Sequence, residues 1–221
     1  YLDAKDASSI DAEISSDAYD RNPAFGHVNQ AVLAPSIYGN KHRFVGTVNR
    51  TFTYGGGKHA TTLSLFFEYA KGGRFSYTYS GDINNDGSGL NDLIYVPTSS
   101  NLSAMAFTGT VAEQNGQRTA LEQYISQDEY LSGRRGQYAE KYALLNPWYS
   151  RYDFRLLQDY KFSNGNSIQF SLDILNIGNF ISSEWGVRQF PTNTQPIGVS
   201  VAGGNPTYSF DPNLKSTFTN D

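Results

Sequence analysis

The sequence predicts an all-β fold, an antiparallel sheet of the transmembrane β-barrel kind, and three observations lead to this prediction. Four segments alternate apolar and polar side chains with a period of two, which places one kind of side chain on each face of a strand. Short and very long connections alternate between these segments. Aromatic side chains gather near both ends of one strand. A barrel strand needs only about 9–11 residues, and every second one meets lipid, so such a sheet can be polar on average.

Composition excludes several classes of protein. The 221 residues carry a net charge of −4 and no block of Lys or Arg, so we expect no nucleic-acid partner. Cysteine is absent, which excludes disulfides, thiolate nucleophiles and Cys-based metal sites. No apolar run approaches the roughly 20 residues of a membrane helix, and no signal peptide is visible. The chain opens on Tyr1, so we expect an N-terminal portion to be missing.

The two clearest strands are expected at residues 150–162 and 167–177. Each has one apolar and one polar face, and in a barrel the apolar face meets lipid while the polar face lines the interior. We expect the following side chains to face lipid or an aromatic girdle: Tyr152, Phe154, Leu156, Tyr160, Phe162, Ile168, Phe170, Leu172 and Ile174. We expect these side chains to face the lumen: Arg151, Asp153, Arg155, Asp159, Gln169, Ser171 and Asp173.

Two further strands are expected at residues 43–54 and 59–80, with a less regular alternation because Arg50 interrupts one apolar row. The Gly-Gly-Gly-Lys sequence at 55–58 joins these two strands. The Ser-Asn-Gly-Asn sequence at 163–166 joins the other two, and its Asn-Gly pair suits a type I′ hairpin. Both connections are therefore predicted to be tight turns.

The remaining connections are far longer than ordinary loops. Residues 81–149 are predicted to form a long extracellular loop, in which residues 118–132 have near-helical spacing of Leu121, Tyr124, Ile125 and Leu131 before a stop at Gly133. We expect one or two short helices there. Residues 1–42 are predicted to be a polar loop with turns at Asn22-Pro23 and Ala34-Pro35.

The stretch "GDINNDGSGLNDLIYVP" at residues 81–97 resembles the start of an EF-hand loop. Asp82, Asn84 and Asp86 offer oxygen ligands at alternating positions, and Gly87 allows the turn. The twelfth position, which should close the cage with a carboxylate, is Leu93, and Asp92 stands one place early. Two interpretations of this loop are left open. In one, calcium is bound by Asp82, Asn84, Asp86 and Asp92; in the other, the loop is a solvated tip without metal. No other cofactor is predicted.

Catalytic motifs are absent from the sequence. The three histidines lie within the first 59 residues and in no metalloprotease arrangement, and no nucleophile elbow or phosphate-binding glycine motif occurs. Arg134 and Arg135 invite a phosphate site, but the flanking Gly133 and Gly136 favour a solvent-facing turn. We therefore expect no enzymatic activity.

Aromatic residues mark the two ends of the strand at 150–162. Trp148 and Tyr149 stand with Tyr152 at one end, and Phe162 stands with Tyr160 at the other. A separation of about ten residues matches the two interfacial girdles of a barrel whose apolar band is about 25 Å tall. Tyr and Trp are also common on carbohydrate-binding faces, so a soluble sugar-binding module remains open.

Several spaced stretches resemble one known family. They are "YSGDINNDGSGLNDLIYVP", "EQYISQDEYLSGRRGQYAEKYALLNPWYSRYDFRLLQDY", "IQFSLDILNIGNF" and "HRFVG". Together, and in the order in which they occur along the chain, they are similar to the C-terminal barrel region of TonB-dependent outer-membrane receptors of the Oar-like and SusC-like type in Bacteroidetes. The likeness extends over nearly the whole chain.

The resemblance implies a 22-stranded barrel in the bacterial outer membrane, closed around a plug domain, that imports a bulky nutrient with energy passed through the TonB complex. Its implied partners are outer-membrane lipid, the rest of the barrel, the plug, TonB and a surface lipoprotein. The sequence contains no plug, no TonB box and no terminal amphipathic strand, so residues 1–221 are expected to be a fragment holding about five of the last six strands. Two alternatives stay open, namely a secreted soluble β-sandwich that binds carbohydrate and a surface adhesin or structural barrel without transport.

Overall fold

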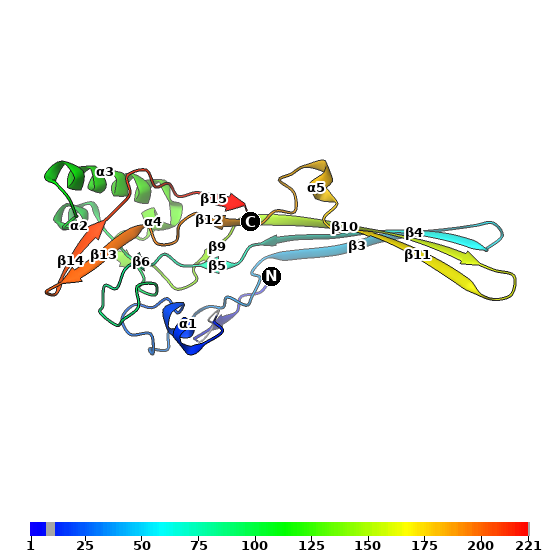
Figure 1. Cartoon of the computed structure of the whole chain (residues 1–221), viewed down its shortest axis with the longest axis horizontal. Helices are drawn as coiled ribbons and strands as arrows, with labels where there is room; N and C mark the ends of the chain where they lie inside the picture. The colour runs from blue at the N-terminus through cyan, green and yellow to red at the C-terminus, as the bar shows by residue number, and fades with distance from the viewer. Residues whose placement is uncertain (8–11, 221) are drawn as a thin grey trace.

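The chain consists of a long four-stranded sheet and a body of helices, short strands and loops at one end of it (Figure 1). The computed structural model describes residues 1–7 and 12–220. The sheet has the order β11-β10-β4-β3 and is antiparallel throughout. Its strands are β3 (Arg43–Tyr54), β4 (His59–Lys71), β10 (Trp148–Lys161) and β11 (Ser167–Ile174).

The four strands expected from the alternation are confirmed, but two of them are shorter than predicted. β4 ends at Lys71 and not at residue 80. Gly72, which follows, lies so close to the chain near Asn146 that a Cβ on it would be 2.5 Å from the Asn146 Cβ. β11 ends at Ile174, and Asn176 shortly after it has a φ of +53°, which is not an extended conformation.

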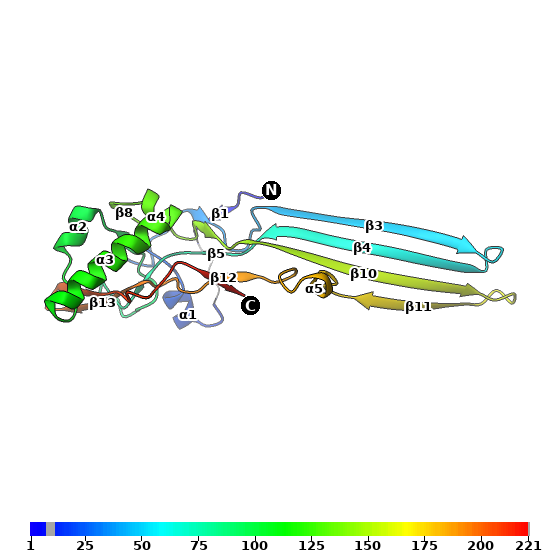
Figure 2. The ribbon, with the colours of Figure 1, turned by 90° about the horizontal axis from the view of Figure 1, so that it is seen from above.

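Two tight hairpins lie together at the end of the sheet remote from the body (Figure 2). In the first, Gly55 and Gly56 have φ values of +59° and +65°, which suit glycine. In the second, only Gly165 has a positive φ, of +86°. The predicted type I′ turn at Asn164-Gly165 is therefore wrong, because that turn needs positive φ at both residues.

The body is built from all three long segments of the chain, residues 1–7 with 12–42, 72–147 and 175–220 (Figure 1). Its helices are α1 (Ser15–Asp20), α2 (Ser99–Ala104), α3 (Val111–Gln127) and α4 (Glu129–Gly133). The short helix α5 (Gly178–Ile181) lies instead beside β10 of the sheet (Figure 1). The strands of the body are β1 (Lys5–Asp6), β2 (Ala34–Pro35), β5 (Arg74–Phe75), β6 (Tyr79–Ser80), β7 (Tyr95–Val96), β8 (Gln137–Tyr138), β9 (Leu144–Leu145), β12 (Gln189–Pro191), β13 (Ile197–Ala202), β14 (Asn205–Ser209) and β15 (Phe218–Asn220).

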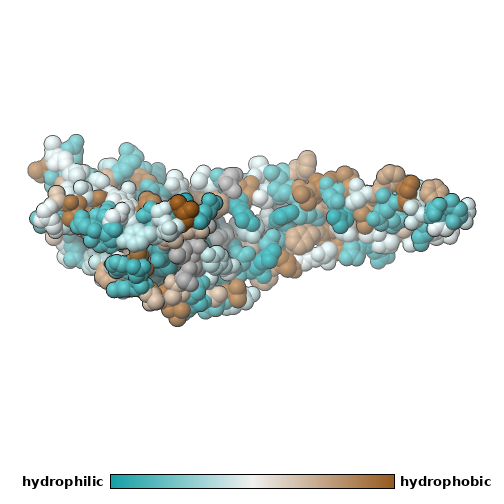
Figure 3. Space-filling view, turned by 60° about the horizontal axis from the view of Figure 1, so that its bottom comes forward, coloured by the Kyte–Doolittle hydropathy of each residue, from teal (hydrophilic) through white to brown (hydrophobic). Residues whose placement is uncertain are grey.

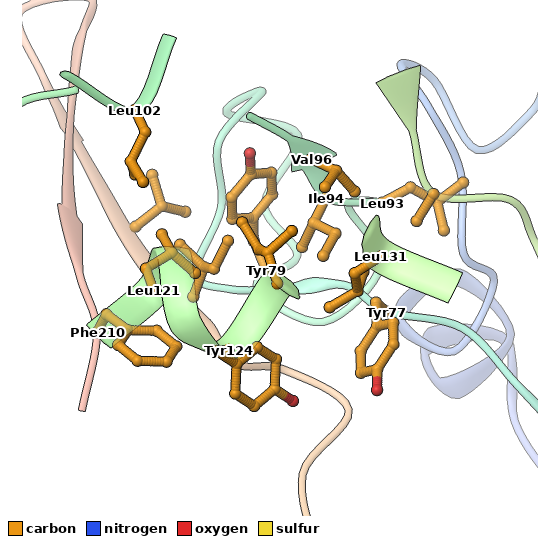
Figure 4. Packing of buried hydrophobic residues seen from close by; sticks show 14 of the residues in the cluster. Tyr77, Tyr79, Leu93, Ile94, Val96, Leu102, Leu121, Tyr124, Leu131 and Phe210 are labelled. Atoms are coloured by element: carbon orange, nitrogen blue, oxygen red, sulfur yellow. The ribbon is translucent and has the colours of Figure 1, made fainter. Parts of the chain in front are cut away.

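The core of the molecule lies in the body and not in the sheet. Leu121, Tyr124 and Ile125 of α3 pack with Ile94 and Phe210, which come from distant parts of the chain (Figure 4). Leu121 is fully buried and Ile125 is 1% exposed. The apolar side chains whose spacing predicted a helix in residues 118–132 are thus buried.

The predicted helical region is longer than expected and is broken in two. α3 begins at Val111, where Thr110 and Glu113 form a reciprocal capping box. Asp128 has an extended backbone and accepts a hydrogen bond from the Leu131 amide at 2.9 Å, so it ends α3 and caps α4.

Residues 1–42 were predicted to be a polar loop with turns, and the described parts of this range contain β1, α1 and β2. The expected turn at Ala34-Pro35 is instead the strand β2, which pairs with β1. The region is anchored to the body, because the Ala24 amide donates to the Asn91 carbonyl at 2.8 Å and the Leu93 amide donates to the Ala24 carbonyl at 3.0 Å. Overall, the chain is rich in strand and has few helices, as predicted.

Candidate functional site

An apolar face crosses the four strands of the sheet, and Arg50 of β3 interrupts one of its rows. The register pairs Phe154 of β10 with Leu65 of β4 and Ile174 of β11, and Leu65 with Val48 of β3. Residues paired in register share a face, so the row of each strand continues in its neighbour. The same face carries Phe44, Phe52, Tyr54, Leu63, Phe67, Tyr69, Tyr152, Leu156, Tyr160, Ile168, Phe170 and Leu172.

Much of this apolar face is exposed. The exposed fractions of Phe44, Val48 and Phe170 are 61%, 64% and 61%. Figure 3 shows hydrophobic side chains at the surface along the whole arm formed by the sheet. In the part of the chain that the structure describes, no second sheet covers this face. A β-sandwich buries such a face against another sheet, so the arrangement differs from that of a sandwich.

Two polar side chains on the apolar face have partners on the same face. Gln158 accepts hydrogen bonds from the Thr61 hydroxyl at 2.6 Å and from the Tyr54 hydroxyl at 3.1 Å, near the hairpins. The guanidinium of Arg50 lies 5.7 Å from the centre of the Phe52 ring. These contacts lower the cost of placing polar groups in the apolar rows.

The opposite face of the sheet is mostly polar, and most of its charged side chains form ion pairs. Arg155 of β10 forms an ion pair with Asp173 of β11. The Gln169 amide donates to the Asp159 carboxylate at 2.7 Å across the same two strands. The predicted lumen-facing residues Arg151, Asp153, Arg155, Asp159, Gln169, Ser171 and Asp173 all lie on this face, and the predicted lipid-facing strand residues lie on the other. Phe162 follows the end of β10 and is 53% exposed. Which environment meets each face stays a prediction.

Aromatic side chains gather at both ends of the apolar face. At the body end, Trp148 stacks on Tyr69 with ring centroids 4.6 Å apart and planes within 6°, and the Lys71 ammonium lies 5.6 Å from the Trp148 ring. At the hairpin end, His59 lies 5.1 Å from the Tyr160 ring. At both ends of the apolar rows, aromatic rings therefore lie next to a polar or charged side chain.

A charged network on the polar face at the body end was missed by the sequence reasoning. Glu68 of β4 is 7% exposed and accepts a hydrogen bond from Arg43 at 2.6 Å and one from the Tyr149 hydroxyl at 3.3 Å. Arg188 lies over the Tyr149 ring, 4.5 Å from its centre. Tyr149 thus belongs to this network and not to the aromatic group around Trp148, because neighbours in a strand point to opposite faces. The sequence contained one signal for this network: Glu68 is the only carboxylate in β4, and the neighbouring strands β3 and β10 contain Arg43 and Arg151.

The four residues proposed as calcium ligands are brought together by the loop at 81–92. Asp82 accepts hydrogen bonds from the amides of Asp86 at 3.1 Å and Gly87 at 2.8 Å, which closes the turn. The Asn84 amide nitrogen lies 2.6 Å from the Asp92 carboxylate, 3.3 Å from the Asp86 carboxylate and 3.1 Å from the Gly26 carbonyl. This nitrogen, and not an oxygen, therefore points at the oxygens that a cation would contact.

Asp92 is the most buried of these carboxylates, at 3% exposed. The pKa of Asp92 is raised to about 6: burial raises it most, the hydrogen bond from the Ile83 amide at 3.0 Å opposes this, and the charges of Asp86 and Asp82 add to the increase. Among residues 1–7 and 12–220, no group of three or more His, Cys, Asp or Glu side chains could hold a metal ion. Calcium binding by Asp82, Asn84, Asp86 and Asp92 stays a prediction.

The remaining polar candidates have structural partners. Arg134 pairs with Glu140 at 2.8 Å, and Arg135 pairs with Glu122 of α3 at 2.6 Å, so both arginines tie the loop after α4 to its surroundings. His27 accepts a hydrogen bond from the Asn29 amide, and His42 and His59 lie among aromatic rings. These contacts give the residues structural roles.

Comparison with known proteins yields no match: no protein-family model, curated protein or solved structure is significantly similar to the chain. None of the helices in the described part of the chain is both long and apolar enough to cross a membrane.

Proposed function

We propose that the chain is the barrel portion of a TonB-dependent receptor in the bacterial outer membrane, and that it binds or imports a bulky nutrient at the cell surface. The observation that carries this proposal is the exposed apolar face, continuous in register over β3, β4, β10 and β11. An exposed apolar surface of this extent is rare on soluble monomers and marks a surface that meets lipid or a partner. Lipid is favoured because the apolar rows are bounded at both ends by rings with polar groups.

The dimensions of the sheet suit a bilayer. From Trp148 to Tyr160, β10 rises about 40 Å, which at a tilt of about 40° corresponds to a height of about 30 Å. This is close to the thickness of the hydrocarbon core of a bilayer, about 30 Å. The apolar band of a barrel would therefore fit between the two aromatic groups.

The unpaired edges of the sheet support the proposal that it is part of a larger sheet. In the described residues, β3 pairs only with β4, and β11 pairs only with β10. Long strands with unpaired edges are an aggregation hazard that barrels remove by closure. We therefore infer that further barrel strands pair with both edges, and that the polar face turns toward a plug domain.

The positions of turns and body favour one orientation. Both tight hairpins lie at one end and all long segments lie at the other (Figure 2). In outer-membrane barrels the short turns are periplasmic and the long loops extracellular. The body would then cover the outer mouth and contact the nutrient or a surface lipoprotein partner. Transport and the TonB partner rest on the family resemblance, and a barrel adhesin without transport is the alternative.

The chain contains no cysteine, which allows a direct test of the two faces. Spin labels on single cysteines at Leu156 and Leu172 sample the apolar face, and labels at Leu157 and Ser171 sample the polar face. In outer membranes, we expect the labels at Leu156 and Leu172 to collide mainly with dissolved oxygen. We expect the labels at Leu157 and Ser171 to collide mainly with a water-soluble nickel chelate. The proposal fails if both pairs meet the nickel complex equally, which is the result expected of a soluble protein.

A further inference from the structure

A cavity of about 480 Å³ lies in the body, outside the sheet and outside the loop at 81–92. One wall is formed by the N-terminal segment at residues 22–35, and the floor by Leu93 and residues 139–141. Its volume falls in the range of about 300–1,000 Å³ that is usual for small-molecule sites.

Most of the cavity lining is apolar. Val28, Leu93 and Ala139 are buried in its floor and wall, at 7%, 7% and 3% exposed. Phe25 and Leu33 line it but remain 57% and 69% exposed, so apolar surface continues from the interior to the mouth. An apolar molecule entering the cavity would remove this surface from water.

A buried cation lies in the same cavity. Lys141 is 7% exposed, and its ammonium donates a hydrogen bond to the Asn22 side-chain carbonyl at 2.5 Å and lies 5.2 Å from the Tyr142 ring. Within residues 1–7 and 12–220, Lys141 forms no ion pair with a carboxylate. Burial lowers the pKa of Lys141, and the negative charge of Asp6 opposes this. An ammonium has three donors, and a buried charge without a counter-ion is costly.

The neighbouring charges leave the cavity open to an anion. Lys5 also lines it and adds a second positive charge. Glu140 lines it as well, but its carboxylate is bound to Arg134 at 2.8 Å. The carboxylate nearest to Lys141 in sequence therefore already has a partner.

The walls are held in place without a ligand. The Ala24 amide is bound to the Asn91 carbonyl, and the Tyr142 amide donates to the Ser76 hydroxyl at 2.7 Å. β1 and β2 close the same region by pairing Lys5 with Pro35. A cavity whose walls are fixed in this way loses little freedom on binding.

We propose that this cavity binds a small organic anion with one carboxylate and an apolar body, with the carboxylate at Lys141 and the apolar part against Val28 and Leu93. The carboxylate of the ligand forms the ion pair that Lys141 lacks within the described residues, and accepts hydrogen bonds from its ammonium. Binding does not depend on which environment surrounds the sheet, so the proposal stands apart from the membrane function.

The test compares 4-phenylbutyrate with 4-phenylbutanol, two probes that share one skeleton and differ in charge. Binding to the full chain is measured by equilibrium dialysis at pH 7, with the same detergent in both compartments. We expect the acid to bind at least tenfold more tightly than the alcohol. Lys141→Met should weaken acid binding at least tenfold and change alcohol binding less than twofold. Lys58→Met, in the distant hairpin at 55–58, should change neither.

Equal binding of acid and alcohol to the unaltered protein, or binding of neither, overturns the proposal without any variant. Equal weakening of both probes by Lys141→Met also overturns it, because the lysine would then only support the fold. Should Lys141→Met not fold, Lys141→Gln is measured in its place, and the comparison of the two probes on the unaltered chain still decides.

Discussion

Arginine at Leu156 should destabilise the protein in a membrane, whereas arginine at the adjacent Leu157 should not. Leu156 lies on the apolar face, paired with Leu63 and Leu172, and Leu157 lies on the polar face, paired with Thr62 and Ser171. The two variants therefore make the same chemical change one residue apart and on opposite faces. The native Arg155 already stands on the polar face, in an ion pair.

The magnitude follows from the place of Leu156 along β10. The midpoint between Trp148 and Tyr160 is Phe154, so Leu156 lies about 5 Å in height from the middle of the apolar band. An arginine facing lipid costs about 2–4 kcal/mol at the midplane and about 0–1 kcal/mol at the interfaces. We expect Leu156→Arg to lower the free energy of unfolding by about 2–3 kcal/mol and Leu157→Arg by under about 1 kcal/mol.

The assay is guanidinium-induced unfolding of the complete barrel in phospholipid vesicles, followed by tryptophan fluorescence. The same pair of variants is measured in outer membranes by resistance to extraction. Equal losses of stability for the two variants would refute the assignment of the apolar face to lipid, and with it the proposed membrane role.

Three further predictions concern the body. Leu121→Ala empties a fully buried position and should cost about 2–5 kcal/mol in denaturant unfolding, whereas Val111→Ala, at a position 73% exposed, should change stability by less than about 0.5 kcal/mol. Because the pKa of Asp92 is raised from 3.8 to about 6, the folded state takes up a proton before the unfolded state does. Stability should therefore increase as the pH falls through 6 toward 3.8, and Asp92→Asn should flatten this dependence in melting curves; an unchanged slope in the variant would contradict it. Calcium, if bound at residues 81–92, should protect the loop from limited proteolysis, with protection lost on adding chelator or in Asp82→Asn, and identical digestion in all samples counts against the metal.

Local sequence determined the strands, the two hairpins and the existence of the helical region. Alternation with period two reports the two faces of a strand directly, which is why the apolar and polar rows of β10 and β11 could be assigned to faces. Near-helical spacing of Leu121, Tyr124 and Ile125 likewise predicted a helix. The turn type at Asn164-Gly165 was wrong because composition does not distinguish a turn with two positive φ values from one with a single positive φ.

Only the tertiary structure decided which distant residues meet. It joins Glu68 to Tyr149, places Gln117 where its side chain accepts from the Phe210 amide, and brings the N-terminal segment over Lys141 to form the cavity. It also shows that the apolar rows of four strands align into one exposed face. The physical reason is that periodicity encodes the direction of a side chain relative to its own backbone, whereas these contacts join residues many tens of positions apart and depend on how the long segments pack together.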